Sequence, residues 1–346
     1  MASGTRVSDV PCRQVASSRP KRRTMRAARL VAPRSWAVEE TAVPEPAEGE
    51  VRIRLRGCGV CGSNLPPWEG RPWFDYPLEH GSPGHEGWGV VDALGRGVEG
   101  LRPGDPVTML SYHAFREYDI ADASAVVALP QQLDSMHFPG EALGCAMNVW
   151  RRCAVQESDV VAIVGLGFLG SLLVQLAVGS GATVIAINRR RGPLRLAMKF
   201  GAQHQLELDD GETVVRRVHE LTDGAGCHCA IEATGLAEPL EVASKLVRTR
   251  GRLVIAGYHQ DGPRQINLQD WNWRGLDVIN AHERDPAIYR SGIAAAVDAV
   301  DSGRLDPAPL YSHVWPLDRI NDAFAIADER PEGFMKSLVV MHEERG

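Results

Sequence analysis

The 346-residue chain has no long apolar run. Its apolar stretches, such as residues 160–164, are far shorter than the roughly 20 residues that a membrane-spanning helix needs. The seven cysteines are an odd number, and only Cys58/Cys61 and Cys227/Cys229 lie close together in sequence, which does not fit a disulfide framework. We therefore expect a cytoplasmic protein without a membrane span, in which cysteine serves packing or metal binding.

Acidic residues outnumber basic ones outside the first 24 residues. The formal net charge is −6, yet this first segment holds six basic residues against the single acidic Asp9, so the rest of the chain is more acidic than the total indicates. An acidic body argues against a nucleic-acid partner, because binding to phosphates needs clustered cations. We predict that residues 1–24 are a disordered, solvated tail, or that they precede a natural start at Met25. The segment also lacks the apolar stretch of a secretory signal.

Two patterns divide the remaining chain. From Met25 to about Pro130, short apolar runs are separated by glycine and proline, and residues 50–55 alternate with period two, as expected of a half-buried strand. From Gly140 onward, strand and helix patterns alternate, which is typical of a parallel sheet with helices on both faces. In this part we predict strands at 160–164, 183–187, 228–233, 252–256 and 276–279, and helices at 140–153, 168–178, 194–200 and 286–302.

The predicted fold class is therefore α/β, with two domains. Residues 25–145 and 290–346 form a mostly β domain, and residues 146–289 form a doubly wound, parallel-sheet domain. Residues 336–340 are expected to form a strand that returns to the first domain.

A glycine-rich sequence follows the first strand of the second pattern. Residues 165–170 read Gly-Leu-Gly-Phe-Leu-Gly between an apolar strand and a helix, the context that a dinucleotide-binding turn requires. Gly165 allows the tight turn, Gly167 lets the backbone approach a pyrophosphate, and Gly170 lets the helix pack against the strand. With Phe168 and Leu169, these glycines are predicted to bind a nicotinamide dinucleotide at the helix N-terminus.

The end of the next strand carries no carboxylate. An acidic side chain there would bind the ribose hydroxyls of NAD and repel a 2′-phosphate, but residues 188–191 read Asn-Arg-Arg-Arg. Arginine suits bidentate phosphate binding, so we predict that Asn188, Arg189 and Arg190 contact the cofactor and that NADP is preferred over NAD. The alternative is that the arginines are solvated and Asn188 binds an unphosphorylated ribose.

Three segments before the dinucleotide turn concentrate cysteine, histidine and glutamate. Residues 57–64 read Gly-Cys-Gly-Val-Cys-Gly-Ser-Asn, residues 83–87 read Pro-Gly-His-Glu-Gly, and residues 140–145 read Gly-Glu-Ala-Leu-Gly-Cys. Thiolate, imidazole and carboxylate ligands can together form a zinc shell with one open position. Spacing alone leaves core packing of these residues equally open.

These three segments and the dinucleotide turn, in this order, closely resemble the zinc-dependent medium-chain dehydrogenases/reductases, which include alcohol, sorbitol and threonine dehydrogenases. The resemblance runs from about Met25 to Met341. It implies a GroES-like catalytic domain beside a Rossmann domain, and a homodimer or homotetramer.

The resemblance also assigns the metal ligands. Cys61 and His85 match the first two catalytic zinc ligands, and Glu86 matches a neighbouring carboxylate that binds the metal in some members. Cys145 stands where alcohol dehydrogenases have their third ligand, and Glu141 stands where the polyol branch has a glutamate near the metal. We favour Cys145 as the third ligand, with Glu86 or Glu141 able to take part.

The chain departs from many relatives in two places. Residues 109–118 contain no cysteine, so we expect one catalytic zinc and no structural zinc lobe. Pro66 replaces a histidine that passes protons outward in many alcohol dehydrogenases, whereas Ser63 remains at the inner position of that relay.

The expected reaction is hydride transfer between a nicotinamide cofactor and a secondary alcohol or ketone. Cys61, Ser63, His85 and Glu86 are the predicted catalytic residues, and the retained Glu141 favours a polyol, sugar or cyclitol substrate. One alternative is a zinc-free quinone or enoyl reductase on the same scaffold, and another is a non-catalytic redox sensor that binds the cofactor.

Aromatic residues add two weaker expectations. Trp68, Trp73, Phe74 and Tyr76 either stack on a sugar or cyclitol in the substrate cleft or simply cover that cleft. For residues 271–273, Trp-Asn-Trp, we favour a place in the core over a subunit interface.

Overall fold

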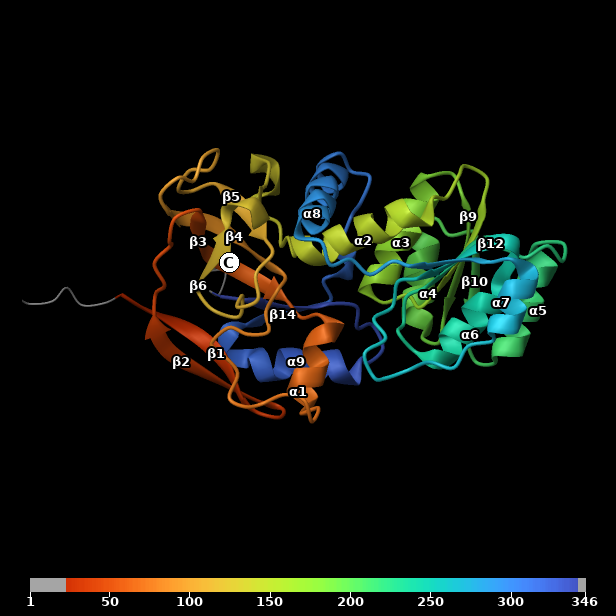
Figure 1. The fold of residues 1–346 in the computed structure, drawn as a ribbon, viewed down its shortest axis with the longest axis horizontal. Helices are drawn as coiled ribbons and strands as arrows, with labels where there is room; N and C mark the ends of the chain where they lie inside the picture. The colour runs from red at the N-terminus through yellow and green to blue at the C-terminus, as the bar shows by residue number, and fades with distance from the viewer. Residues whose placement is uncertain (1–22, 342–346) are drawn as a thin grey trace, which may run out of the picture.

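The computed structural model describes residues 23–341, so the predicted tail lies almost wholly outside the described residues. Figure 1 shows a β-rich region on one side and a helix-covered sheet on the other, with α2 and α8 between them. Within the described residues, every helix is too short or too polar to cross a membrane.

The β-rich region is built on a seven-stranded sheet. Its strands run in the order β14-β15-β3-β4-β5-β7, and β6 pairs with β3. A separate hairpin of β1 and β2 lies beside this sheet (Figure 1). The strands are β1 (Thr24–Ala32), β2 (Ser35–Ala42), β3 (Glu50–Gly59), β4 (Gly87–Leu94), β5 (Pro106–Met109), β6 (Tyr118–Asp122), β7 (Val126–Ala128), β14 (His313–Pro316) and β15 (Ser337–Val340). The helices of this region are α1 (Leu65–Glu69) and α9 (Ile320–Glu329).

The last strand returns to the first region, as predicted. β15 pairs antiparallel with β3, where Val339 faces Cys58, and parallel with β14. Because β3 leads directly to Cys61, the chain's C-terminal segment lies beside the predicted metal ligands.

The prediction that residues 50–55 form a half-buried strand is only partly right. Val51, Ile53 and Leu55 are buried, but Arg52 is buried as well. Its guanidinium lies 2.7 Å from Asp92 and 2.8 Å from Glu45, and these ion pairs let a charged side chain occupy a buried position.

The second region contains a six-stranded parallel sheet in the order β10-β9-β8-β11-β12-β13. Its strands are β8 (Val160–Val164), β9 (Thr183–Asn188), β10 (His204–Glu207), β11 (Cys227–Glu232), β12 (Val247–Ile255) and β13 (Asp277–Asn280). Its helices are α3 (Phe168–Gly179), α4 (Arg191–Lys199), α5 (Gly211–Leu221), α6 (Ala237–Leu246) and α7 (Leu268–Arg274). This arrangement confirms the predicted α/β class. The strand order reverses between β8 and β11, which is where a doubly wound sheet binds its ligand.

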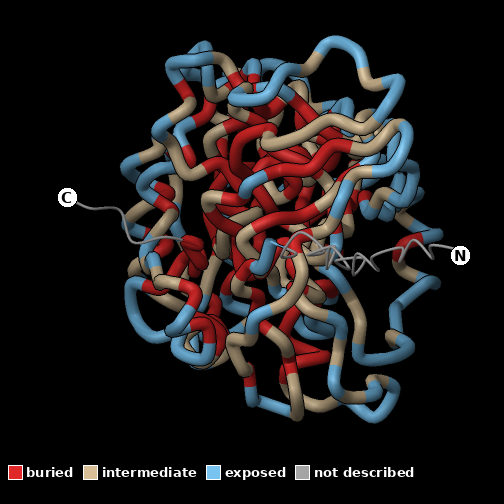
Figure 2. Tube along the Cα trace, turned by 90° about the vertical axis from the view of Figure 1, so that its left-hand side faces the viewer, coloured by how far each residue is buried: buried red, intermediate tan, exposed pale blue. Residues whose placement is uncertain are grey.

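Two long helices join the regions. α2 (Gly140–Cys153) and α8 (Pro286–Asp301) pack against each other, with Gly144 in backbone contact with Gly292 and Ile293. The domain limits predicted at 145/146 and 289/290 therefore fall inside continuous helices. Figure 2 shows the buried chain concentrated in the interior, and one apolar cluster includes Phe138 of the first part and Ile163 of the second.

Candidate active site

A tight turn after β3 presents Cys61. Cys61 caps the short helix of residues 62–64, and its backbone amide donates a hydrogen bond of 2.8 Å to Oδ1 of Asn64. The buried Asn64 also donates through Nδ2 to the carbonyl oxygen of Pro83, at 3.0 Å. One asparagine thus fixes the Cys61 turn against the loop that carries His85.

The orientation of His85 suits a metal ligand. Its Nδ1 lies 2.9 Å from the carbonyl oxygen of Pro83, to which it can donate a proton. This bond leaves Nε2 on the side of Cys61, 3.4 Å from Oγ of Ser63. Burial lowers the pKa of His85, but the hydrogen bond and charge of Cys61 and the charges of Glu141 and Glu86 outweigh it and raise the pKa to about 10. The pocket therefore favours positive charge at this position.

Glu86 lies beside these residues in a fully buried position. Its Oε2 would lie 1.8 Å from a side chain at Gly59, so only glycine at 59 leaves room for this carboxylate. The ammonium of Lys336, just before β15, hydrogen-bonds Oε1 at 2.7 Å and lies 2.6 Å from Oε2. The same ammonium lies 4.8 Å from the ring centre of Phe168, the first residue of α3. Lys336 thus bridges the predicted metal ligands and the predicted cofactor turn.

Three of the predicted ligands lie together. Ligand atoms of Cys61, His85 and Glu86 all lie within 4.8 Å of one another. Cys145 and Glu141 are on the adjacent face of α2, four residues apart, and the Cys145 thiol donates to Oε1 of Glu141 at 3.2 Å. Burial, followed by the charge of Glu141, raises the pKa of Cys145. Cys145 is outside the compact set of three, although it was the favoured third ligand.

The predicted dinucleotide turn connects β8 to α3. Gly165 has a φ of +97°, a conformation that favours glycine. A side chain at Gly170 would lie 1.9 Å from the carbonyl oxygen of Gly165, whereas one at Gly167 would meet no atom within 4 Å. The open space at Gly167 lies at the N-terminus of α3, next to Phe168 and Leu169, where backbone amides can bind phosphate.

The polar residues after β9 have separate partners. Oδ1 of Asn188 accepts from the Leu166 amide at 3.1 Å, and its Nδ2 donates to the carbonyl of Arg190 at 3.0 Å. Asn188 therefore joins the glycine-rich turn to the segment that follows β9. Arg190 donates to backbone carbonyls of residues 330–334, Arg191 pairs with Glu207 at 2.9 Å, and Arg189 is exposed.

The side chains fit the groups that the sequence predicts. A thiol, an imidazole nitrogen with its partner nitrogen already bonded, and a carboxylate form a donor set that zinc prefers. Oε2 of Glu86 makes no hydrogen bond within the described residues but lies 2.6 Å from the Lys336 ammonium, so a metal ion would share this carboxylate with Lys336. The open space at Gly167 likewise fits a pyrophosphate.

Comparison with known proteins places this arrangement in a family. The zinc-binding dehydrogenase family matches residues 169–298, and the family of alcohol dehydrogenase GroES-like domains matches residues 47–131. The chain belongs to the zinc-dependent medium-chain dehydrogenase/reductase superfamily.

Relatives of this dehydrogenase match over most of their length. Sorbitol dehydrogenase of Halalkalibacterium halodurans is 24% identical, over 84% of this chain and 91% of the relative. The 2-dehydro-3-deoxy-L-galactonate 5-dehydrogenase of Pseudoalteromonas atlantica is 25% identical, over 93% of this chain and all of the relative. A zinc-binding dehydrogenase of Sinorhizobium meliloti, solved with NADP, has a TM-score of 0.79 and 25% identity, over 92% of this chain and 99% of its own.

The predicted aromatic lining of the dehydrogenase is partly wrong. Trp68 is buried against Phe324 in the core of the β-rich region, because α1 packs on α9 there. Tyr76 packs on the same core, and its hydroxyl donates to the carbonyl of Pro67. Trp73, at 59% exposure, remains accessible.

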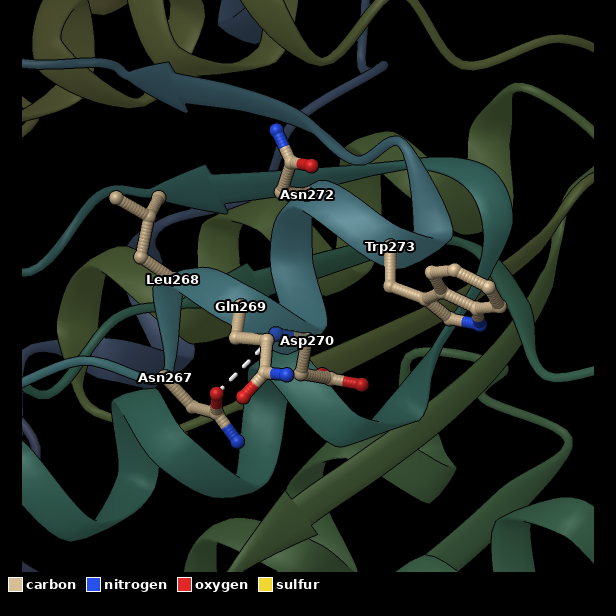
Figure 3. Close-up of a pocket in the computed structure, with 6 residues that line it drawn as sticks. All are labelled: Asn267, Leu268, Gln269, Asp270, Asn272 and Trp273. Atoms are coloured by element: carbon tan, nitrogen blue, oxygen red, sulfur yellow. Dashed lines mark hydrogen bonds between the residues drawn. The ribbon is translucent and has the colours of Figure 1, made fainter.

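The two tryptophans of α7 have opposite environments. Trp271 is 7% exposed and packs under the parallel sheet, as predicted. Trp273 is 88% exposed, so its expected place in the core is wrong. Neighbouring helix positions face different sides, and Trp273 is one of the residues that line the surface pocket drawn in Figure 3. That pocket is formed by Asn267, Leu268, Gln269, Asp270, Asn272 and Trp273.

Two residues of the site were missed by the sequence analysis. Lys336 was assigned only to the returning strand, although a single lysine beside an apolar run was a signal of a buried partner. The second is Tyr311, whose ring stacks on Phe168 at 6.1 Å and whose hydroxyl is buried without a hydrogen-bond partner in the described residues. Nothing in the sequence around Tyr311 marked it.

Proposed function

We propose that this dehydrogenase transfers hydride between a nicotinamide cofactor and a secondary alcohol or ketone of a polyol, sugar or cyclitol. The observation that carries the proposal is the buried set of Cys61, His85 and Glu86, joined to the cofactor turn through Lys336 and Phe168. This arrangement would bring substrate oxygen and cofactor to one place, which is what hydride transfer requires.

The proposed site holds one zinc. Cys61, His85 and Glu86 would hold it, with Cys145, or Glu141 as the alternative, completing the shell from α2. When bound, the metal supplies a Lewis acid that stabilises negative charge on the substrate oxygen. Ser63, whose Oγ lies 3.4 Å from the imidazole of His85, would relay the hydroxyl proton of the substrate, accepting it at Oγ while its own proton passes through the cofactor ribose to water. Asn64 would hold the Cys61 turn in place and, through Nδ2, would bond to the same Pro83 carbonyl that orients the imidazole.

The proposed cofactor preference is for NADP over NAD. Gly165, Gly167 and Gly170, with Phe168 and Leu169, would bind the pyrophosphate. No carboxylate stands at the end of β9 to repel a 2′-phosphate, and the exposed Arg189 is free to pair with one. Similar proteins have been solved with each cofactor, one with NADP and one with NADH, so the proposed preference rests on residues 188–191.

The substrate class is supported by relatives and by α2. Relatives named for sorbitol and for a deoxy-galactonate act on polyhydroxylated compounds. Glu141 adds a buried carboxylate beside the metal ligands, which could accept a hydrogen bond from a second substrate hydroxyl.

We also propose a cytoplasmic homodimer or homotetramer, with residues 25–145 and 290–346 as the catalytic domain and residues 146–289 as the cofactor domain. The cysteines of the described part are all free thiols, which fits a reducing compartment.

Zinc content tests the proposal first. Protein purified without added metal should hold about one zinc per subunit by elemental analysis, and should oxidise some member of a panel of polyols and cyclitols with NADP. The Cys61→Ala variant should hold none. A folded, zinc-free wild-type protein that reduces quinones or enones would instead establish the zinc-free reductase, and absence of all turnover with bound cofactor would establish the redox sensor.

A further inference from the structure

The three arginines after β9 differ in how their side chains are engaged. Arg189 is exposed and has no hydrogen bond or ion pair within the described part of the chain. Arg191 is exposed and pairs with Glu207 on the neighbouring strand β10. Arg190 is half-buried, and one guanidinium nitrogen, Nη1, lies against three backbone carbonyls.

Those carbonyls belong to one short segment at the end of α9. Nη1 of Arg190 lies 2.8 Å from the oxygen of Phe334, 3.3 Å from that of Pro331 and 3.5 Å from that of Arg330. Residues 330–334 belong to the β-rich region, whereas Arg190 precedes α4 of the parallel-sheet region. The contact therefore crosses between the two regions, at the end of β9 where the ribose of the cofactor is expected.

The same segment leads directly into the metal site. Two residues after Phe334, Lys336 pairs with Glu86. The hydroxyl of Ser312 accepts hydrogen bonds from the amides of Met335 and Lys336, at 2.9 Å and 3.2 Å, and so restrains the path of the chain between the two ends. Residues 330–336 thus form a short link, bonded to Arg190 at one end and to Glu86 at the other.

We infer that Arg190 is a positioning residue that fastens this link, and that Arg189 alone of the three arginines selects for a 2′-phosphate. The inference rests on the proposed function, and it corrects the expectation that both Arg189 and Arg190 bind the cofactor. A guanidinium that already donates to three carbonyls, one of them that of the buried Phe334, would have to give up these bonds to reach a phosphate, and the Phe334 carbonyl would then lose the hydrogen bond from Arg190. Arg189 has no such bonds to lose.

Through this link, Arg190 affects how Lys336 is held in the metal site, although Arg190 does not itself contact Glu86. Loss of the Arg190 bonds frees one end of residues 330–336, and the ammonium of Lys336 is then less well held against Glu86 and Phe168. Arg190 therefore acts equally whichever cofactor is bound, whereas Arg189 acts only on the cofactor that carries the phosphate.

Four variants test the assignment: Arg189→Ala, Arg190→Ala, Arg190→Lys and, as a matched control on the same segment, Glu332→Gln. Glu332 forms an exposed ion pair with Arg195 and acts on Arg190 only through its charge, so its variant should change kcat and the rate of zinc loss far less than Arg190→Ala does. The measurements are dissociation constants of NADPH and NADH from ligand fluorescence, the rate of zinc loss to a chelator, and kcat and KM with each cofactor.

Arg189→Ala should weaken NADPH binding by about 10- to 100-fold, because a charge-assisted hydrogen bond is lost, and should leave NADH binding unchanged. Arg190→Ala should leave the ratio of the two dissociation constants unchanged, lower kcat by about the same factor with both cofactors, and speed zinc loss. Arg190→Lys should recover part of kcat, because an ammonium can still donate to a carbonyl.

A selective loss of NADPH binding in Arg190→Ala would overturn the inference, as would unchanged kcat and unchanged zinc loss. Wild-type protein that binds NADPH and NADH equally would refute the NADP preference and the role of Arg189. The equal loss of kcat in Arg190→Ala would still decide the role of Arg190.

Discussion

The cofactor turn and the metal site are built in contrasting ways. The turn is a continuous run of six residues, 165–170, from the end of β8 into the first turn of α3, and it needs glycine at 165 for its positive φ and at 170 for close packing. The metal site draws side chains from four segments separated by up to 275 residues, from Cys61 to Lys336. A local turn tolerates change elsewhere in the chain, whereas an assembled site depends on every segment that supports it.

The largest effect is expected from breaking the metal site alone. Cys61→Ala should lower kcat by about 10³-fold or more, because a Lewis acid supplies several kcal/mol of charge stabilisation. The dissociation constant of NADPH should not change, because the Lys336–Glu86 pair that contacts Phe168 of the turn is retained. Cys227→Ala, a buried cysteine of the parallel sheet, is the matched control and should keep its zinc. Loss of NADPH binding in Cys61→Ala would show that the two sites are not separate.

The buried ion pair tests how far the assembled site depends on a distant segment. Lys336→Met removes one partner of the pair, leaves Glu86 buried and uncompensated, and should lower the free energy of unfolding by about 3–5 kcal/mol. Urea denaturation measures the change. The double variant Lys336→Met, Glu86→Gln should recover part of the loss, since it removes the uncompensated charge. If the single and double variants are equally unstable, packing by the lysine stem outweighs the charge.

A single methyl group added at Gly170 should disrupt the glycine-rich turn. In Gly170→Ala the new carbon would lie 1.9 Å from the carbonyl oxygen of Gly165, so the strand and helix must separate. We expect a loss of about 1–3 kcal/mol in unfolding free energy. NADPH and NADH should both bind more weakly, while the zinc content stays the same.

Gly179→Ala, at the end of the same helix, is the control for this prediction. Its methyl group meets no atom within 4 Å, so it should stabilise the protein by up to about 1 kcal/mol. Calorimetry and fluorescence titration of both variants give the comparison. Normal cofactor binding by Gly170→Ala would contradict the role given to the turn.

The smallest effect concerns two tryptophans in one short helix. Trp273→Ala should change the unfolding free energy by less than about 0.5 kcal/mol, because the indole is exposed. Trp271→Ala, its buried counterpart, should cost about 3–5 kcal/mol. A large, concentration-dependent loss in Trp273→Ala would mean that another copy of the chain covers this surface.

Sequence reasoning was most successful where one short segment contains its own determinants. Strand β8 and helix α2 have the predicted limits, because apolar runs and punctuating glycines and prolines are local features. It did less well where a neighbour far along the chain decides the environment. Arg52 was expected on an exposed face, and only the nearby carboxylates of Asp92 and Glu45 make its burial possible.

The candidate site divides in the same manner. Cys61, His85 and Glu86 were predicted, and the structure brings them together. Cys145 was favoured as a ligand by resemblance, but its thiol is bonded to Glu141 in the structure. Lys336 was overlooked because a lysine in sequence shows no partner, and its partner Glu86 is 250 residues away.

The sequence by itself determined the α/β class, the glycine-rich turn and the residue types for a metal site, because these depend on local periodicity, backbone freedom and side-chain chemistry. Only the tertiary structure decided which charges are paired. The return of β15 beside β3 places Lys336 on Glu86, and the end of α9 brings three carbonyls to Arg190. A buried charge or a half-buried guanidinium takes its role from whichever oxygen the fold brings within about 3 Å, and that distance is not a property of any single segment.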